Sequence, residues 1–151
     1  MPLFGDRKPV LFLQTEFNEG GGRFSPDMHW IAHQSDESGL SEVYVRPFPG
    51  PGGKWQVSTN GGASPRWRRD GKEIYYFTDD GKLMAAEVKG VGSTFEVGNV
   101  RPLFDLQSKG EGSFHDVTAD GQRFLIQTLA GAQTSAPITL VTNWMGELKK
   151  K

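Results

Sequence analysis

The sequence contains no cysteine among its 151 residues. Disulfide bonds, thiolate catalysis and cysteine-ligated metal sites are therefore excluded. No apolar run approaches the roughly 18 residues that cross a bilayer, and the apolar stretch at the N-terminus is too short for the core of a signal peptide. We therefore expect a cytoplasmic chain that has no membrane partner.

An excess of charge of either sign is also missing. The chain has 17 basic and 18 acidic residues and a net charge of −1, so no basic surface indicates a nucleic-acid partner. Helical periodicity is almost absent as well. The single helix candidate is the short tail over 144–151, which ends in three lysines and is expected to fray.

A sequence block that occurs three times is the main feature that is present. The copies are Phe24–His33, Trp67–Tyr76 and Val117–Ile126. Each has an apolar residue, an Asp three positions later, and then an alternating run typical of a β-strand. The Asp recurs after 43 and then 50 residues, and strand units repeating at that length are typical of β-propeller blades.

The recurring acids are Asp27, Asp70 and Asp120. We interpret them as structural turn residues, because an Asp can accept a backbone N–H bond two residues on and a following Gly can take a positive φ. A calcium site would need several oxygen ligands that converge on one point. Met28 replaces the Gly in the first copy, so that turn is either strained or of another type.

The strand pattern predicts an all-β chain that forms one half-propeller domain over 1–151, made of three four-stranded blades. Its predicted parts are a lone strand over 10–14, a first blade over about 20–58, a second over about 59–106, an incomplete third over about 110–143, and the tail. The last two strands of the second blade are expected over 83–88 and within 95–104. The strands of the third blade are expected over 113–117, 123–127 and 138–142. If the strands of a blade are called a, b, c and d, the order is d, abcd, abcd, abc. The third blade lacks a d strand, and the lone strand lacks a blade.

Three blades are fewer than the four to eight of a closed propeller. We therefore expect a homodimer that completes six blades around a two-fold axis. In this arrangement strand 10–14 of each chain supplies the missing d strand of its partner by strand addition. Such a ring leaves no sheet edge or end face free.

The candidate ligand-binding residues are Arg66, Arg68 and His115. They lie in the first strand of their blades, strand a, which lines the channel of a propeller. Arginine and histidine there could bind a small anionic ligand or another protein, although polar groups on a pore wall also serve only to solvate it. His29 and His33 are too far apart in a strand to share a metal ion, and we expect one to be packed and the other to lie near a turn. No cofactor and no metal site are predicted.

The repeats resemble the WD40-like, TolB-type (PD40) propeller repeat that is written around Ser-Pro-Asp-Gly. The match rests on Ser25-Pro-Asp27 and on the stretches Phe24–Phe48, Gly52–Ser58, Arg66–Glu73 and Asp116–Phe124. These stretches closely resemble the C-terminal part of the propellers that follow the kinase domain in many bacterial serine/threonine kinases. The resemblance implies a sensing or interaction module, and no kinase motif is present in the chain.

These observations predict a non-catalytic propeller scaffold for binding or interaction, assembled by strand exchange between two chains. Two alternatives remain open at this point. One is an enzyme, either a hydrolase or a lyase, that has its site in the channel. The other is a remnant of a kinase-linked sensor propeller.

Overall fold

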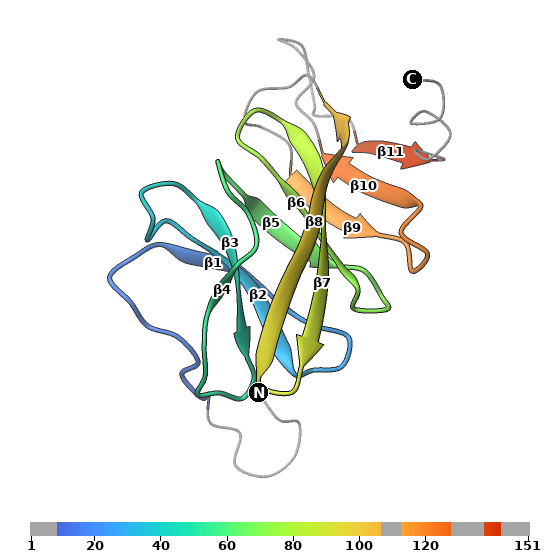
Figure 1. Ribbon diagram of the computed structural model, residues 1–151. Coiled ribbons are helices and arrows are strands. Elements are labelled where there is room, and N and C mark those ends of the chain that lie inside the picture. The colour runs from blue at the N-terminus through green and yellow to red at the C-terminus, as the bar shows by residue number, and fades with distance from the viewer. Residues whose placement is uncertain (1–8, 107–112, 128–137, 143–151) are drawn as a thin grey trace.

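The computed structural model describes residues 9–106, 113–127 and 138–142, with residues 113–115 and 138–142 described by their backbone alone. The described residues form strands and turns, which are arranged as three antiparallel sheets placed side by side (Figure 1). The all-β architecture expected from the sequence is confirmed. The tail over 144–151 lies outside the described residues.

The three sheets, named blades 1 to 3 here, follow one another along the chain. Blade 1 contains β1 (Glu19–Phe24), β2 (Trp30–Ser35), β3 (Glu42–Pro47) and β4 (Trp55–Gln56), and blade 2 contains β5 (Ala63–Trp67), β6 (Glu73–Phe77), β7 (Lys82–Val91) and β8 (Thr94–Asp105). Blade 3 contains β9 (Ser113–Val117), β10 (Arg123–Gln127) and β11 (Ile138–Thr142). In the part of the chain that is described, blade 3 has three strands, and β11 lies at its outer edge.

Residues 10–14 do not lie in a strand of this single chain. The side chains of Val10 and Leu11 are 88% and 71% exposed, and the ring of Phe12 lies 6.0 Å from that of Phe48. The strand predicted for this segment therefore has no partner among the described strands.

The turn between the first two strands has the same geometry in every blade. Each Asp carboxylate accepts the backbone N–H two residues on: His29 to Asp27 at 3.1 Å, Lys72 to Asp70 at 3.0 Å and Gln122 to Asp120 at 3.0 Å. The residue after each Asp has a positive φ, of 63° at Met28, 73° at Gly71 and 68° at Gly121. The first turn therefore keeps the common geometry and accepts the strain of a non-glycine residue, about 1–2 kcal/mol.

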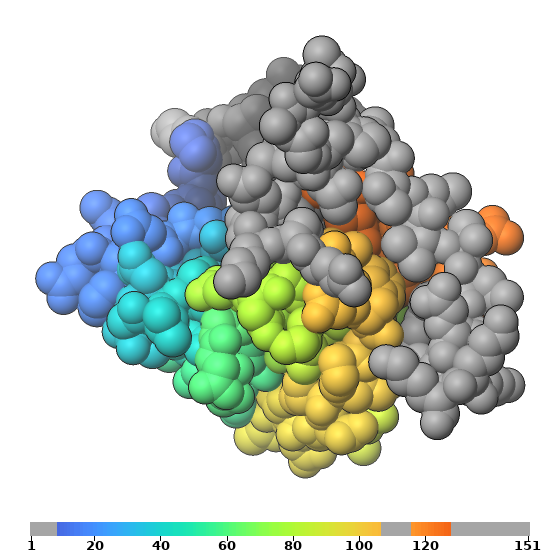
Figure 2. All heavy atoms as spheres, turned by 90° about the horizontal axis from the view of Figure 1, so that it is seen from above, coloured from blue at the N-terminus to red at the C-terminus, as the bar shows by residue number. Residues whose placement is uncertain are grey.

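The core between blades 1 and 2 is apolar and rich in aromatic rings. Along β6, Ile74 and Tyr76 face blade 1, because successive residues of a strand point to opposite sides. The other buried members of this core are Trp30, Ala32, Val43, Val45, Val57, Ala86, Val88 and Phe95. Viewed from above, blade 1 (blue to cyan) lies directly beside blade 2 (green to yellow), as this shared core requires (Figure 2).

The β7–β8 hairpin is longer than the sequence predicted, since strands were expected over 83–88 and within 95–104. The extension packs on blade 1: the Trp30 and Phe95 rings lie 5.0 Å apart. A Cβ built on Gly90 would lie 2.5 Å from Trp30 Nε1, so only glycine admits the indole at that point. Burial against the neighbouring blade therefore stabilises strand residues that have little strand propensity of their own.

The core between blades 2 and 3 uses the opposite face of β6. Tyr75 and Phe77 point toward blade 3, and they pack with Leu83, Ala85, Leu103, Phe124 and Ile126. The Phe124 ring meets the Tyr75 ring edge-on at a centroid distance of 5.0 Å. Each blade of the chain is thus held to the next by an interdigitated apolar layer.

Candidate functional site

The first strands of the three blades, β1, β5 and β9, lie next to one another in that order. Each carries a charged residue four positions before its turn Asp: Arg23, Arg66 and Asp116. Burial lowers the pKa of Arg66, the positive charge of Arg23 lowers it further, and the negative charge of Asp116 opposes both. The charges of these three side chains therefore act on one another. We call Arg23, Arg66 and Asp116 the inner row, and β1, β5 and β9 the inner strands.

Contacts between blades 1 and 2 hold this row in place. The indole Nε1 of Trp67 donates a hydrogen bond of 3.0 Å to the backbone oxygen of Arg23. The backbone N–H of Ser64 donates to Oε1 of Gln34 at 2.9 Å. Both bonds link β5 to blade 1, so the backbones that carry Arg23 and Arg66 are positioned relative to each other.

The three predicted ligand-binding residues do not form one group. Arg66 lies in the inner row, where its Nη1 donates to the Pro65 oxygen at 2.9 Å. Arg68 lies between blades 2 and 3, in ion pairs with Asp70 at 3.1 Å and Glu73 at 3.0 Å. His115 belongs to β9 by its backbone, and its side chain lies outside the described part of the chain.

Sequence reasoning missed two members of the inner row, Arg23 and Asp116. A signal for them was present, since both occupy the repeat position of Arg66, four residues before the turn Asp. The repeated block defined above begins at its apolar position, one residue after these charged positions. Comparison of the positions just before each block would have found the row.

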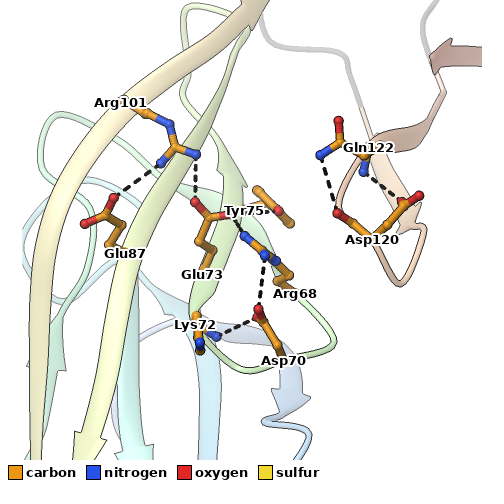
Figure 3. Close-up of polar contacts among 9 residues, drawn as sticks. All are labelled: Arg68, Asp70, Lys72, Glu73, Tyr75, Glu87, Arg101, Asp120 and Gln122. Carbon is orange, nitrogen blue, oxygen red and sulfur yellow. Dashed lines mark hydrogen bonds and ion pairs between the residues drawn. The ribbon is translucent and has the colours of Figure 1, made fainter. Parts of the chain in front are cut away.

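The ion cluster between blades 2 and 3 centres on the carboxylate of Glu73 (Figure 3). Its side chain is only 8% exposed, and it accepts bonds from Arg101 at 2.7 Å, Arg68 at 3.0 Å and the Tyr75 hydroxyl at 2.9 Å. Burial raises the pKa of Glu73, but hydrogen bonds from Arg101, Arg68 and Tyr75 outweigh it and hold the pKa below its usual value. Burial, together with the bond to Glu73, raises the pKa of Tyr75.

This cluster is arranged for structure rather than proton transfer. A general acid or base works best when its pKa lies near the operating pH, whereas the pKa values of Glu73 and Tyr75 are both displaced away from neutrality. All the cluster's hydrogen bonds link residues of β5–β8 and their turns. The cluster therefore fixes the face of blade 2 against which blade 3 packs.

Of the two histidines of blade 1, one is packed and the other lies in a turn, as expected. His33 is buried, and its Nδ1 lies 2.9 Å from Oε2 of Glu19. Burial lowers the pKa of His33, while the charge of Glu19 partly opposes this shift. The side chain of His29 is 74% exposed in the turn, 3.4 Å from the Asp27 carboxylate.

Neither a metal centre nor a membrane-spanning helix is found in the parts of the chain that the structure describes. Within residues 9–106, 113–127 and 138–142, no three side chains of His, Asp or Glu gather so as to hold a metal ion. Over the same ranges, no helix has the length and apolar character needed to cross a bilayer.

Comparison with known proteins identifies the fold. No known protein family matches the sequence, and no curated protein matches it either. Among solved structures, TolB from Acinetobacter baumannii matches 83% of this chain at 21% identity, with a TM-score of 0.56. An oligogalacturonate lyase from Vibrio parahaemolyticus matches 70% of the chain at 15% identity, with a TM-score of 0.48.

The chain therefore has a TolB-like β-propeller fold. The match spans 30% of the TolB chain, so the three blades correspond to part of that larger propeller. At this level of identity the likeness concerns architecture alone.

Proposed function

We propose that this protein is a non-catalytic binding scaffold, in which two chains exchange N-terminal strands to complete one six-bladed propeller. The inner strands of the ring form its ligand-binding wall. Arg23 and Arg66 of each chain attract an anionic group, such as the carboxylates of a small molecule or of a partner protein. The ring holds these charges in fixed positions, and no step of bond making or breaking is assigned to them.

One observation is the main support for the proposed two-chain assembly. Blade 3 has three described strands, while the apolar segment over residues 10–14 of the same chain pairs with no described strand. Among the residues whose side chains the structure describes, nine large hydrophobic residues are exposed, and six of them lie between residues 10 and 28. Monomeric proteins rarely gather exposed apolar side chains in this way unless the surface binds something. Addition of this segment to the edge of β11 that no described strand pairs with would bury both features together.

The anionic ligand class is supported by the inner row. Arg23 and Arg66 lie close enough for the charge of one to lower the pKa of the other. Like charges held together are destabilising, and an anion that bridges them removes that repulsion. In a two-fold ring the pair occurs twice, which favours ligands with several carboxylates.

The assembly is tested by the mass in solution, measured by light scattering on a sizing column. We expect a mass near twice 16.7 kDa that persists on dilution, because an exchanged strand buries a large interface. Deletion of residues 1–15 is expected to yield monomers. A dimer that survives this deletion unweakened rules out strand exchange, and a monomeric full chain rules out the assembly as a whole.

The ligand class is tested by calorimetric titration with citrate, a tricarboxylate. We expect Arg66→Gln to weaken citrate binding by about tenfold, since a charged hydrogen bond contributes roughly 1.5–3 kcal/mol. Arg69→Gln is the matched control, because Arg69 is exposed and lies outside the inner row. Equal losses of citrate affinity in the two variants would mean that citrate binding depends only on net charge. The assignment of Arg66 to the ligand-binding wall would then be wrong.

A further inference from the structure

Within the chain, the first turns of blades 2 and 3 each pack on the blade before them. The Asp70–Gly71 turn of blade 2 and Ser25, Pro26 and Trp30 of blade 1 enclose a small cavity of about 120 Å³. The Gly121 turn of blade 3 sits on blade 2, where a Cβ at Gly121 would lie 2.5 Å from the Tyr75 hydroxyl and 3.4 Å from Arg68 Cδ. Figure 3 shows this turn, marked by Asp120 and Gln122, on the Tyr75 side of the ion cluster.

The repeat predicts an equivalent surface, which we call the seat, on the face of blade 3 that points away from blade 2. By position relative to the turn Asp, Thr118 corresponds to Arg68, Arg123 to Glu73 and Leu125 to Tyr75. These three residues line a mainly apolar concavity of about 250 Å³, together with Asp116 and Val117. Of the described residues, only those of β9, β10 and their turn line it.

The turn that fits this seat is the one at the start of blade 1. It alone carries a side chain at the positive-φ position, Met28, which is 53% exposed. Glycine is required at 121 because the rigid, buried Tyr75 leaves no space. Blade 3 presents the shorter Leu125 instead, so its seat has room for a flexible methionine side chain.

Charge complementarity points to the same pairing. Arg123 is exposed beside the seat on blade 3, and Asp27 is exposed beside Met28. Inside the chain, the corresponding position on blade 2 is the acid Glu73, which needs Arg68 and Arg101 to balance it. Asp116 also lines this seat, and Arg123 supplies the charge of the sign that Asp27 attracts.

We propose that Met28 of one chain inserts into the seat formed by Thr118, Arg123 and Leu125 of a second copy. This contact rests on the proposed two-chain ring. It identifies the residues that determine which blades of the two chains pack together. By two-fold symmetry it forms twice. The methionine that strains the blade 1 turn is then the residue that closes the ring.

The test uses a pair of cysteines, since the chain has none of its own. Met28→Cys combined with Leu125→Cys is expected to give a covalent dimer with a short bismaleimide, visible on a denaturing gel. Val91→Cys with Leu125→Cys is the matched control, because Val91 is 44% exposed at the tip of the β7–β8 hairpin. The control pair is expected to remain monomeric on the gel.

Met28→Gly separates the contact from a purely structural role. We expect its dimer dissociation constant to rise at least about tenfold, the loss of one buried side chain per contact. Glycine also relieves the positive φ, so the unfolding midpoint of the isolated chain should not fall. A purely structural Met28 would leave dissociation unchanged.

The outcomes distinguish this contact from the function on which it rests. A dimer by light scattering that neither cross-links through 28 and 125 nor weakens in Met28→Gly overturns the contact and leaves the two-chain scaffold standing. A chain that is monomeric at every concentration overturns both. Cross-linking of the 28/125 pair alone, together with weakened association of Met28→Gly, supports the contact.

Discussion

Phe124→Ala is expected to destabilise the protein by about 3–5 kcal/mol, the usual cost of removing a buried aromatic ring. Phe124 is fully buried, with ring contacts to Tyr75 at 5.0 Å and Phe104 at 5.8 Å. Its loss leaves a cavity in the layer that joins blades 2 and 3. The measurement is urea unfolding at one fixed protein concentration, because association would otherwise shift the midpoint.

Leu40→Ala is the control for this prediction. It removes a large apolar side chain from a site that is 53% exposed, so the expected change is within about 0.5 kcal/mol. If Phe124→Ala costs no more than Leu40→Ala, blade 3 is not packed on blade 2 as described.

Gly121→Ala is expected to cost far more than Gly71→Ala, although both glycines occupy the same turn position. Their φ angles, 68° and 73°, impose a similar backbone strain of about 1–2 kcal/mol on alanine. At Gly71 the nearest atom to a new Cβ is 3.8 Å away, whereas at Gly121 the Tyr75 hydroxyl is 2.5 Å away. Overpacking of this kind adds about 1–3 kcal/mol.

The excess cost at Gly121 should depend on the Tyr75 hydroxyl. A double-mutant cycle with Tyr75→Phe removes the colliding oxygen, and Gly121→Ala is then expected to approach the cost of Gly71→Ala. Unfolding free energies of the four chains provide the comparison. Equal costs of Gly121→Ala with and without the hydroxyl would show that the blade 3 turn is not seated on Tyr75.

Local chemistry accounts for the strands that sequence reasoning located well. The strands expected over 113–117, 123–127 and 138–142 coincide with β9, β10 and β11. Alternating residues and an Asp-Gly turn define such units within a few positions. The β7–β8 hairpin was underestimated because the place of Gly90 in β7 depends on Trp30, which lies about 60 positions earlier in the chain.

The sequence by itself determined the three repeats, the all-β class and the turn chemistry of Asp27, Asp70 and Asp120, because each depends on residues close together in the chain. Only the tertiary structure decided where the charged side chains lie. Arg68 meets Glu73 and Asp70 between the blades, and Glu73 also binds Arg101, 28 positions away. Arg66 meets the charges of Arg23 and Asp116 from two neighbouring blades. A long side chain can reach partners on either adjacent sheet, and the packing of the blades selects among them.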